Sequence, residues 1–453
     1  MNFRIEKDSM GEIEVEASKL WKAQTQRSLN NFQIGSEKMP MELIYAIVTL
    51  KKSIALVNGE NKKLDIDKSK AIEEACDDIL MGKYDDQFPL SIWQTGSGTQ
   101  TNMNVNEVIS SIANAKYYLG VHPNDDVNKC QSTNDVFPSS IHIATYILAK
   151  GKLIPSLENL IESFKKLSER LPDVIKVGRT HLQDATPIRV NQEVSAWTFA
   201  LEKSLDQIKA NLDAIRPLAI GGSAVGTGIN TYDGYASQVI AKLNSITGYE
   251  FLESQNKFYS LSSKNELLYF HSALNGLAAE LIKIGNDIRW LSSGPRSGIG
   301  EYFIPANEPG SSIMPGKVNP TQVEAMTMVC AQVFGNQTSI TFAASQGNFQ
   351  LNVYMPLIAY NMLQSVQLLS DVMDSARSHM VDGMGINEEK IKENLQRSLM
   401  TVTALNPYIG YDNSARLAKY AHQHGLSLFE ANRDLKILSD EDLRKYLDPN
   451  LMV

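Results

Sequence analysis

The stretch SKNELLYFHSALNGLAAELIKIGNDIRWL, residues 263–291, has the spacing of one long amphipathic helix. From Leu267 onward, the side chains that would face a core recur every three or four positions, close to a heptad repeat. They are Leu267, His271, Leu274, Leu277, Leu281, Ile284, Ile288 and Leu291. At about 1.5 Å per residue this helix would be roughly 45 Å long. A stripe of that length needs helical partners, within one subunit and between subunits.

Four other stretches have the same spacing and could supply those partners. They are residues 154–171, 194–215, 323–333 and 358–373. Nowhere does the chain contain the alternating apolar and polar runs that a large β-sheet requires. We therefore predict a mainly α fold whose centre is a bundle of about five long helices.

Three domains are expected along the 453 residues. Residues 1–131 are weakly patterned and predict a mixed, mostly helical N-terminal domain. Residues 132–388 contain the long apolar stripes and predict the central helical-bundle domain. From residue 389 the sequence becomes more charged and its apolar spacing shorter, which predicts a small C-terminal helical domain over 389–453.

Composition excludes several classes of protein. The net charge of −8 argues against nucleic-acid binding, and no apolar run approaches the length of a membrane span. The first residues lack the apolar core of a signal peptide. The three cysteines are widely spaced, which argues against a disulfide framework or a zinc site and favours a reducing compartment. The expected location is cytoplasmic.

A polar loop, GSSIMPGKVNP at residues 310–320, is the most unusual local feature. It gathers Ser311, Ser312 and Lys317 and ends at Asn319-Pro320, a pair typical of helix starts. Free backbone N–H groups at a helix start attract anions, and the lysine adds a positive charge. The loop therefore predicts an anion-binding site, although an ordinary turn is the simpler interpretation of such a composition.

Three more loops rich in Ser, Thr and Asn are each expected to lead into a helix: residues 95–104, 132–138 and 180–187. In the last of these, Thr186-Pro187 resembles a helix start, and His181 lies just before it. Together the four loops suit a small dicarboxylate. The seven histidines are scattered without a metal-binding pattern, so we predict no metal and no cofactor.

These loops carry a resemblance to a known family. The loop at 310–320 is similar to the signature of the fumarase/aspartase superfamily of lyases. Further motifs align in the family's order: QTGSGTQTNMNVNE (94–107), HPNDDVNKCQSTNDVFP (122–138), GRTHLQDATP (178–187), GGSAVGTGINT (221–231), NKFYSLSSKNEL (256–267) and TALNPYIGYDNSA (403–415). The resemblance covers nearly the whole chain and implies the superfamily's three-domain fold and a homotetramer whose active sites are shared between subunits.

Within the superfamily the sequence resembles the class II, iron-independent fumarases. His181 in THLQDATP separates it from the aspartate ammonia-lyases, which resemble TQLQDAVP at this point. The resemblance implies reversible anti hydration of fumarate to (S)-malate through a carbanion, a reaction of the tricarboxylic acid cycle. The alternatives are an aspartate ammonia-lyase or another fumarate-releasing lyase, and a non-catalytic helical scaffold. A scaffold would have no use for Ser311, His181 and Lys317.

The resemblance also implies roles for individual residues. Ser311 is implied as the base, and His181 as the acid that helps the hydroxyl leave, through a water and with Glu324 as its partner. An alternative makes a water bound by His181 and Glu324 the proton acceptor, and the sequence leaves both open. The residues implied to hold the substrate are Ser97, Thr99, Ser132, Thr133, Asn134, Thr180, Ser312, Lys317 and Asn319.

A second anion site is implied around His122, Asn124 and Asp125. In many bacterial members an Arg-Lys pair precedes this motif, whereas this chain has Tyr118-Leu119-Gly120.

Overall fold

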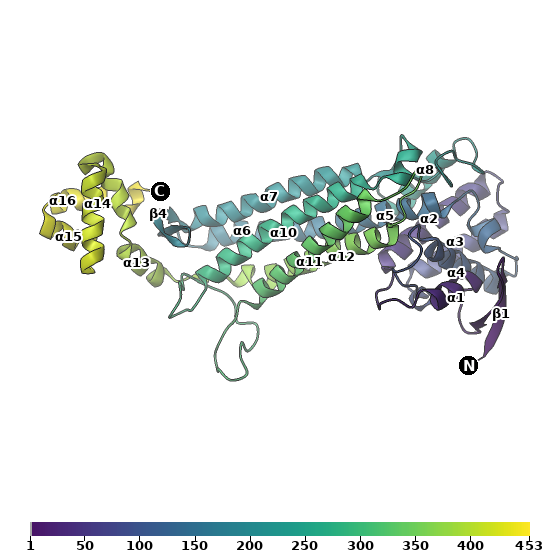
Figure 1. Cartoon of the computed structure of the whole chain (residues 1–453), viewed down its shortest axis with the longest axis horizontal. Coiled ribbons are helices and arrows are strands. Elements are labelled where there is room, and N and C mark those ends of the chain that lie inside the picture. The colour runs from purple at the N-terminus through teal and green to yellow at the C-terminus, as the bar shows by residue number, and fades with distance from the viewer. Residues whose placement is uncertain (1) are drawn as a thin grey trace. The chain divides into compact units, whose positions relative to one another are not determined.

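The computed structural model describes residues 2–453, which form sixteen α-helices and four two-stranded sheets (Figure 1). The fold is mainly α, as the sequence predicts. The helices before the bundle are α1 (Ala23–Asn31), α2 (Met41–Glu60), α3 (Ile66–Leu80), α4 (Thr99–Tyr117) and α5 (Thr133–Leu148). Most of helix α2 is buried, because it packs against α3, α5 and the later helix α8 (Tyr235–Thr247).

The long helices lie where the sequence predicts them. They are α6 (Ile154–Arg170), α7 (Val190–Ala214), α10 (Asn265–Leu291), α11 (Thr321–Ser345) and α12 (Met355–His379). Their facing sides exchange polar contacts as well as apolar ones. His271 of α10, for example, bonds with Gln337 of α11 and with Ser365 of α12. Farther along, Trp197 of α7 donates to Asp287 of α10.

Contacts group the chain into two compact units that do not follow the order of the sequence. The first unit contains Met1–Pro155, Leu205–Ala278 and Val329–Ser370. The second contains Ser156–Ser204, Ala279–Met328 and Asp371–Val453. Helices α7, α10, α11 and α12 each contribute residues to both units. The three domains expected from the sequence, with boundaries at 131/132 and 388/389, stay a prediction.

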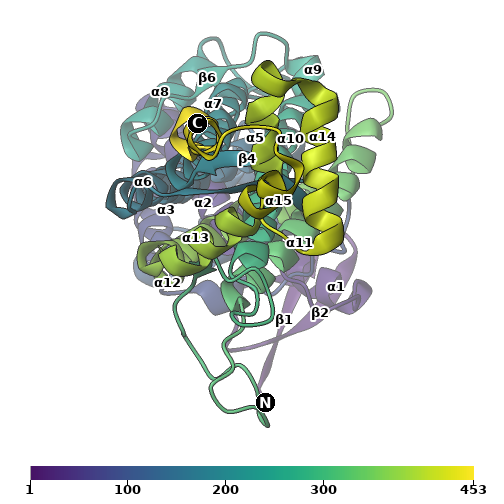
Figure 2. The ribbon, with the colours of Figure 1, turned by 90° about the vertical axis from the view of Figure 1, so that its left-hand side faces the viewer.

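The C-terminal helices belong to the second unit and are drawn in yellow-green to yellow in Figure 2. They are α13 (Glu388–Arg397), α14 (Asn406–His424), α15 (Leu428–Leu435) and α16 (Asp440–Tyr446). A separate group of buried side chains holds the last three together: Val402, Leu405, Leu417, Ala421, Leu428, Ala431, Leu443 and Leu447.

The strands are short. β1 (Phe3–Asp8) pairs antiparallel with β2 (Gly11–Glu16), and β3 (Ile175–Thr180) pairs antiparallel with β4 (Gln183–Arg189). Two residue pairs make up each remaining sheet: β5 (Pro217–Leu218) with β6 (Leu252–Glu253), before helix α9 (Lys257–Ser262), and β7 (Tyr302–Phe303) with β8 (Gly385–Ile386).

One predicted helix start is wrong. Thr186 and Pro187 lie inside β4, and helix α7 begins only at Val190. Proline is tolerated there because this sheet has only two strands, each of which is an edge strand. The loop at 180–187 is therefore a hairpin, and His181 lies in its turn.

Within residues 2–453, no helix is long and apolar enough to cross a bilayer. The same part of the chain contains no group of three or more His, Cys, Asp or Glu side chains that could hold a metal ion. Cys76, Cys130 and Cys330 are free thiols.

Candidate functional site

The first group of predicted site residues lies in the first unit, where the loop before α4 meets α5. Gly98 is the N-cap of α4 with φ of 78°, and a Cβ there would lie 2.3 Å from the ring of Phe137 in α5. Only glycine permits this close approach at positive φ. The turn brings the Ser97 and Thr99 hydroxyls within 2.9 Å of each other, so both belong to one hydrogen-bonded pair.

Helix α5 presents the next three predicted residues at its N-terminus. Ser132 is the N-cap, and its hydroxyl accepts from the N–H of Asn134 at 3.2 Å. Thr133 accepts at Oγ1 from Asn102 of α4 at 3.0 Å. The side chain of Asn134 donates to the carbonyl of Ala224 at 2.8 Å. These contacts join the starts of α4 and α5 to the glycine-rich loop at 221–228.

Asp135 fixes that glycine-rich loop. Its Oδ2 accepts from the N–H groups of Gly221 and Ser223 at 3.0 and 2.9 Å, and its Oδ1 accepts from the N–H of Ser132. Complete burial raises the pKa of Asp135 to about 6, although the backbone N–H groups favour the charged form. The loop therefore borders the predicted substrate residues in the first unit.

The proposed second anion site falls on one short turn, Pro123–Val127. His122 caps this turn, because its Nδ1 accepts from the N–H groups of Asn124 and Asp125 at 3.3 and 3.1 Å. A nearby cation, Lys68, is paired with Asp126 at 2.7 Å. The three residues are thus close together, and their binding of an anion stays a prediction.

In the second unit, His181 and Leu182 form the two-residue turn between β3 and β4. Thr180 pairs with Gln183, and the two turn residues have φ of 57° and 60°. Such turns usually contain Asn and Gly, because a side chain is strained at positive φ. A bulge at Gly178 precedes the turn, where a Cβ would lie 2.5 Å from the carbonyl oxygen of Thr186. The exposed imidazole of His181 therefore projects from a tightly specified turn.

The loop of residues 304–320, called the Ser311 loop below, projects from the second unit (Figure 1). Its tip is closed by a backbone bond from Gly310 to Lys317 and by the Asn319 amide, which donates to the carbonyl of Gly310 at 2.7 Å. The Ser311 hydroxyl accepts from the N–H groups of Ile313 and Met314 at 3.2 and 3.1 Å. Two donors on one oxygen stabilise negative charge there.

Ser312 and Lys317 are exposed on the same loop, and Glu324 is exposed in the first turn of α11. Within residues 2–453, no hydrogen bond or ion pair connects Thr180 or His181 with residues 310–324. The predicted residues therefore form three groups: the helix starts in the first unit, the turn of the hairpin, and the Ser311 loop with Glu324.

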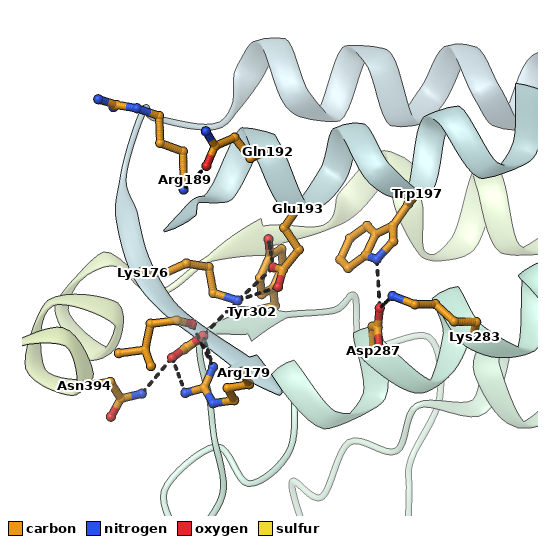
Figure 3. Close-up of polar contacts among 12 residues, drawn as sticks. Lys176, Arg179, Arg189, Gln192, Glu193, Trp197, Lys283, Asp287, Tyr302 and Asn394 are labelled. Atoms are coloured by element: carbon orange, nitrogen blue, oxygen red, sulfur yellow. Dashed lines mark hydrogen bonds and ion pairs between the residues drawn. The ribbon is translucent and has the colours of Figure 1, made fainter. Parts of the chain in front are cut away.

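The sequence did not single out the charged residues that hold the hairpin. Lys176 and Arg179 of β3 bond with carboxylates from α7 and from the root of the Ser311 loop, and Figure 3 shows the arrangement. The clue in the sequence was Lys176 within IKVGRT, the segment that forms β3, where the lysine and the two residues after it are buried.

Two family models match the chain. A model described as lyase matches residues 11–335, and one described as the fumarase C C-terminus matches residues 402–453.

Known proteins match over the full length. A relative from Bacillus subtilis (strain 168), named fumarate hydratase class II, is 53% identical and aligned over 100% of this chain and 99% of its own. One of the same name from Helicobacter pylori (strain J99) is 54% identical over the same shares. The crystal structure of recombinant class II fumarase from Schistosoma mansoni has a TM-score of 0.96 with this chain at 41% identity, covering 99% of this chain and 98% of that one.

Proposed function

The chain belongs to the class II fumarate hydratase family of lyases, and we propose on that basis that its substrate pair is fumarate and (S)-malate, interconverted by addition and removal of water. The observation that carries the proposal is the match over the full length to relatives named for this reaction. The reaction belongs to the tricarboxylic acid cycle. The residue types in the three groups suit a small dicarboxylate, since they supply hydroxyls, amides and one ammonium.

For the chemistry, we assign the base to Ser311. In the direction of malate dehydration, its alkoxide takes the proton from the carbon beside one carboxylate, and the electron pair passes into that carboxylate. The bonds from the N–H groups of Ile313 and Met314 support this role, because they stabilise charge on the oxygen. Lys317 adds a positive charge to the same loop.

His181 acts as the acid. Its protonated imidazole gives a proton to the departing hydroxyl group, so that the carbon–oxygen bond breaks and water leaves. Glu324 is its partner and stabilises the imidazolium. Ser97, Thr99, Ser132, Thr133 and Asn134 hold the carboxylates of the substrate, together with Thr180, Ser312, Lys317 and Asn319.

The working form is a homotetramer in which each active site combines residues from several subunits. Large apolar side chains exposed on the bundle helices support this assembly. They are Phe199 on α7, Tyr269 and Trp290 on α10, and Met328 and Phe342 on α11. A helix with apolar side chains beyond its buried face needs a further partner, which a symmetric assembly supplies.

The assay is the ultraviolet absorbance of fumarate formed from (S)-malate, and, in parallel, from aspartate. We expect fumarate from malate only, and we expect the rate to persist after exhaustive chelation with EDTA. Fumarate from aspartate alone would identify an ammonia-lyase. A rate lost in EDTA and restored by iron would contradict the metal-independent mechanism.

A further inference from the structure

One buried carboxylate, Glu301, lies where several separate segments of the second unit meet. Its side chain is fully buried and accepts two bonds from Arg179, at 2.7 and 3.0 Å. Lys176 lies 3.2 Å away and Asn394 of α13 donates at 3.0 Å. Figure 3 shows Lys176, Arg179 and Asn394 converging from β3 and α13.

The charges in this cluster balance. Lys176, which is 1% exposed, also bonds with both oxygens of Glu193 in α7 at 2.8 Å, and the Tyr302 hydroxyl donates to Glu193. Two cations therefore face two carboxylates. Burial alone would raise the pKa of Glu301, but Arg179 and Lys176 more than offset that effect, so its pKa is lowered. Removing one charge would leave an unpaired cation in a buried place.

The backbone of Glu301 is fixed as firmly as its side chain. Its N–H donates to Leu291 at the end of α10, and its carbonyl accepts from the N–H of Asn387 at 2.8 Å. The next two residues pair with Gly385–Ile386 as β7 and β8. Glu301 thus lies just before β7, which leads into the Ser311 loop, and it joins this root of the loop to the segment before α13.

The Glu301 carboxylate also holds the hairpin, through its ion pair with Arg179. Arg179 lies two residues before His181 and next to the bulge at Gly178. Its guanidinium forms a two-bond pair with Glu301, which restricts both its position and its orientation. β3 in turn contacts α13, whose Asn394 completes the Glu301 contacts. Glu193 of α7 also bonds with Lys176 and with the Tyr302 hydroxyl, but only Glu301 pairs with Arg179, the charged residue next to the turn.

We infer that Glu301 is a positioning residue for the reaction, which holds the His181 turn and the Ser311 loop in place through one buried charge. The inference rests on the proposed roles of His181 and Ser311. Five of the nine residues proposed to hold the substrate carboxylates lie in the first unit, at helix starts that form no bond with Glu301, whereas both proposed acid–base residues lie on segments that Glu301 holds. A change at Glu301 should therefore disturb turnover more than substrate binding.

The test is Glu301→Gln, which keeps the size of the side chain and removes its charge. We expect kcat to fall about 10–100-fold, as displacements of about 1 Å do, while KM changes less than about threefold. Amide hydrogen exchange should become faster in residues 176–186 and in residues 302–319. The matched control is Glu107→Gln, another buried carboxylate, which bonds with Thr25 and with backbone N–H groups in the first unit. It should leave kcat within about threefold.

A milder variant, Arg179→Lys, keeps the positive charge but cannot form both bonds with Glu301. It serves as the test if Glu301→Gln does not fold. It should accelerate exchange in the hairpin alone and lower kcat less. A normal kcat in folded Glu301→Gln would overturn the inference. So would exchange that becomes faster in only one of the two segments of that variant. Inactive wild-type protein would instead refute the proposed function. The exchange measurement would still test whether Glu301 holds the hairpin and the Ser311 loop in place.

Discussion

At the scale of single residues, the turn of the hairpin departs most from local preference. Left-handed φ at two successive non-glycine residues costs on the order of 1–3 kcal/mol each. Such strain persists only where surrounding contacts hold the backbone in place. Here the paired strands β3 and β4 and the Arg179–Glu301 ion pair hold the turn. The histidine gains a defined direction for its imidazole from this strained backbone.

Removing either proposed catalytic side chain should stop most turnover. His181→Asn keeps a similar size but removes the titratable group, so we expect kcat to fall roughly 10²–10⁴-fold, the usual contribution of acid–base catalysis. Ser311→Ala should lower kcat comparably, with only a modest change in KM. The measurement is the steady-state rate of malate dehydration. If Ser311→Ala keeps a near-normal kcat, the base is not Ser311, and the water held by His181 and Glu324 becomes the candidate.

His271 predicts a pH dependence of stability. Its ring bonds with Gln337 at 2.7 Å and with Ser365 at 2.8 Å, and burial lowers its pKa from 6.5 to about 4. Below pH 6.5 the unfolded chain therefore takes up a proton that the folded chain does not. This favours unfolding by about 2 kcal/mol at pH 5, and the effect is absent above pH 6.5.

The check compares wild type with His271→Gln by urea midpoints at pH 7.5 and pH 5. Glutamine keeps a polar side chain but does not titrate. The advantage of wild type should shrink as the pH falls. An advantage that stays constant between the two pH values would show that His271 does not titrate with unfolding.

At the scale of elements, the long helices could be predicted because their apolar spacing is repeated over many turns. The prediction of residues 263–291 differs from α10 by two residues at its start. The hairpin could not be predicted, because the bulge at Gly178 interrupts its alternation and Thr186-Pro187 imitates a helix start. The site loops were recognisable from local composition. Glu301 was not, because its partner Arg179 is 122 positions away in the sequence.

Helix α11 carries a prediction about assembly. Phe342 is 57% exposed in the single chain, and we place it against another subunit. A glutamate there would have to be buried without a partner, so Phe342→Glu should shift the tetramer to smaller species. Native mass measurement gives the result. The matched control is Phe3→Glu on β1, also 57% exposed, which should leave the mass unchanged. An intact tetramer for Phe342→Glu would exclude this part of α11 from the interface.

At the scale of the whole molecule, the proposed tetramer with shared active sites predicts complementation between inactive variants. Ser311→Ala and His181→Asn, refolded together, should form mixed tetramers. If subunits assort at random, about a quarter of the sites would combine an intact Ser311 from one variant with an intact His181 from the other. The rate of malate dehydration should then exceed that of either variant refolded alone. No recovery in mixed tetramers, confirmed by mass, would place both residues of a site on one chain.

The division of the chain into interleaved units also constrains its synthesis. The first unit takes its last segment from Val329–Ser370, so it cannot close until most of the chain has left the ribosome. At about 5–20 residues per second, reaching Ser370 takes roughly 20–75 s. During that interval residues 265–278 of α10 lack the segments of α11 and α12 that His271 contacts, so part of their apolar stripe should stay exposed to solvent. Chaperones that shield the nascent chain should therefore raise the yield of this protein more than that of a chain built from consecutive domains.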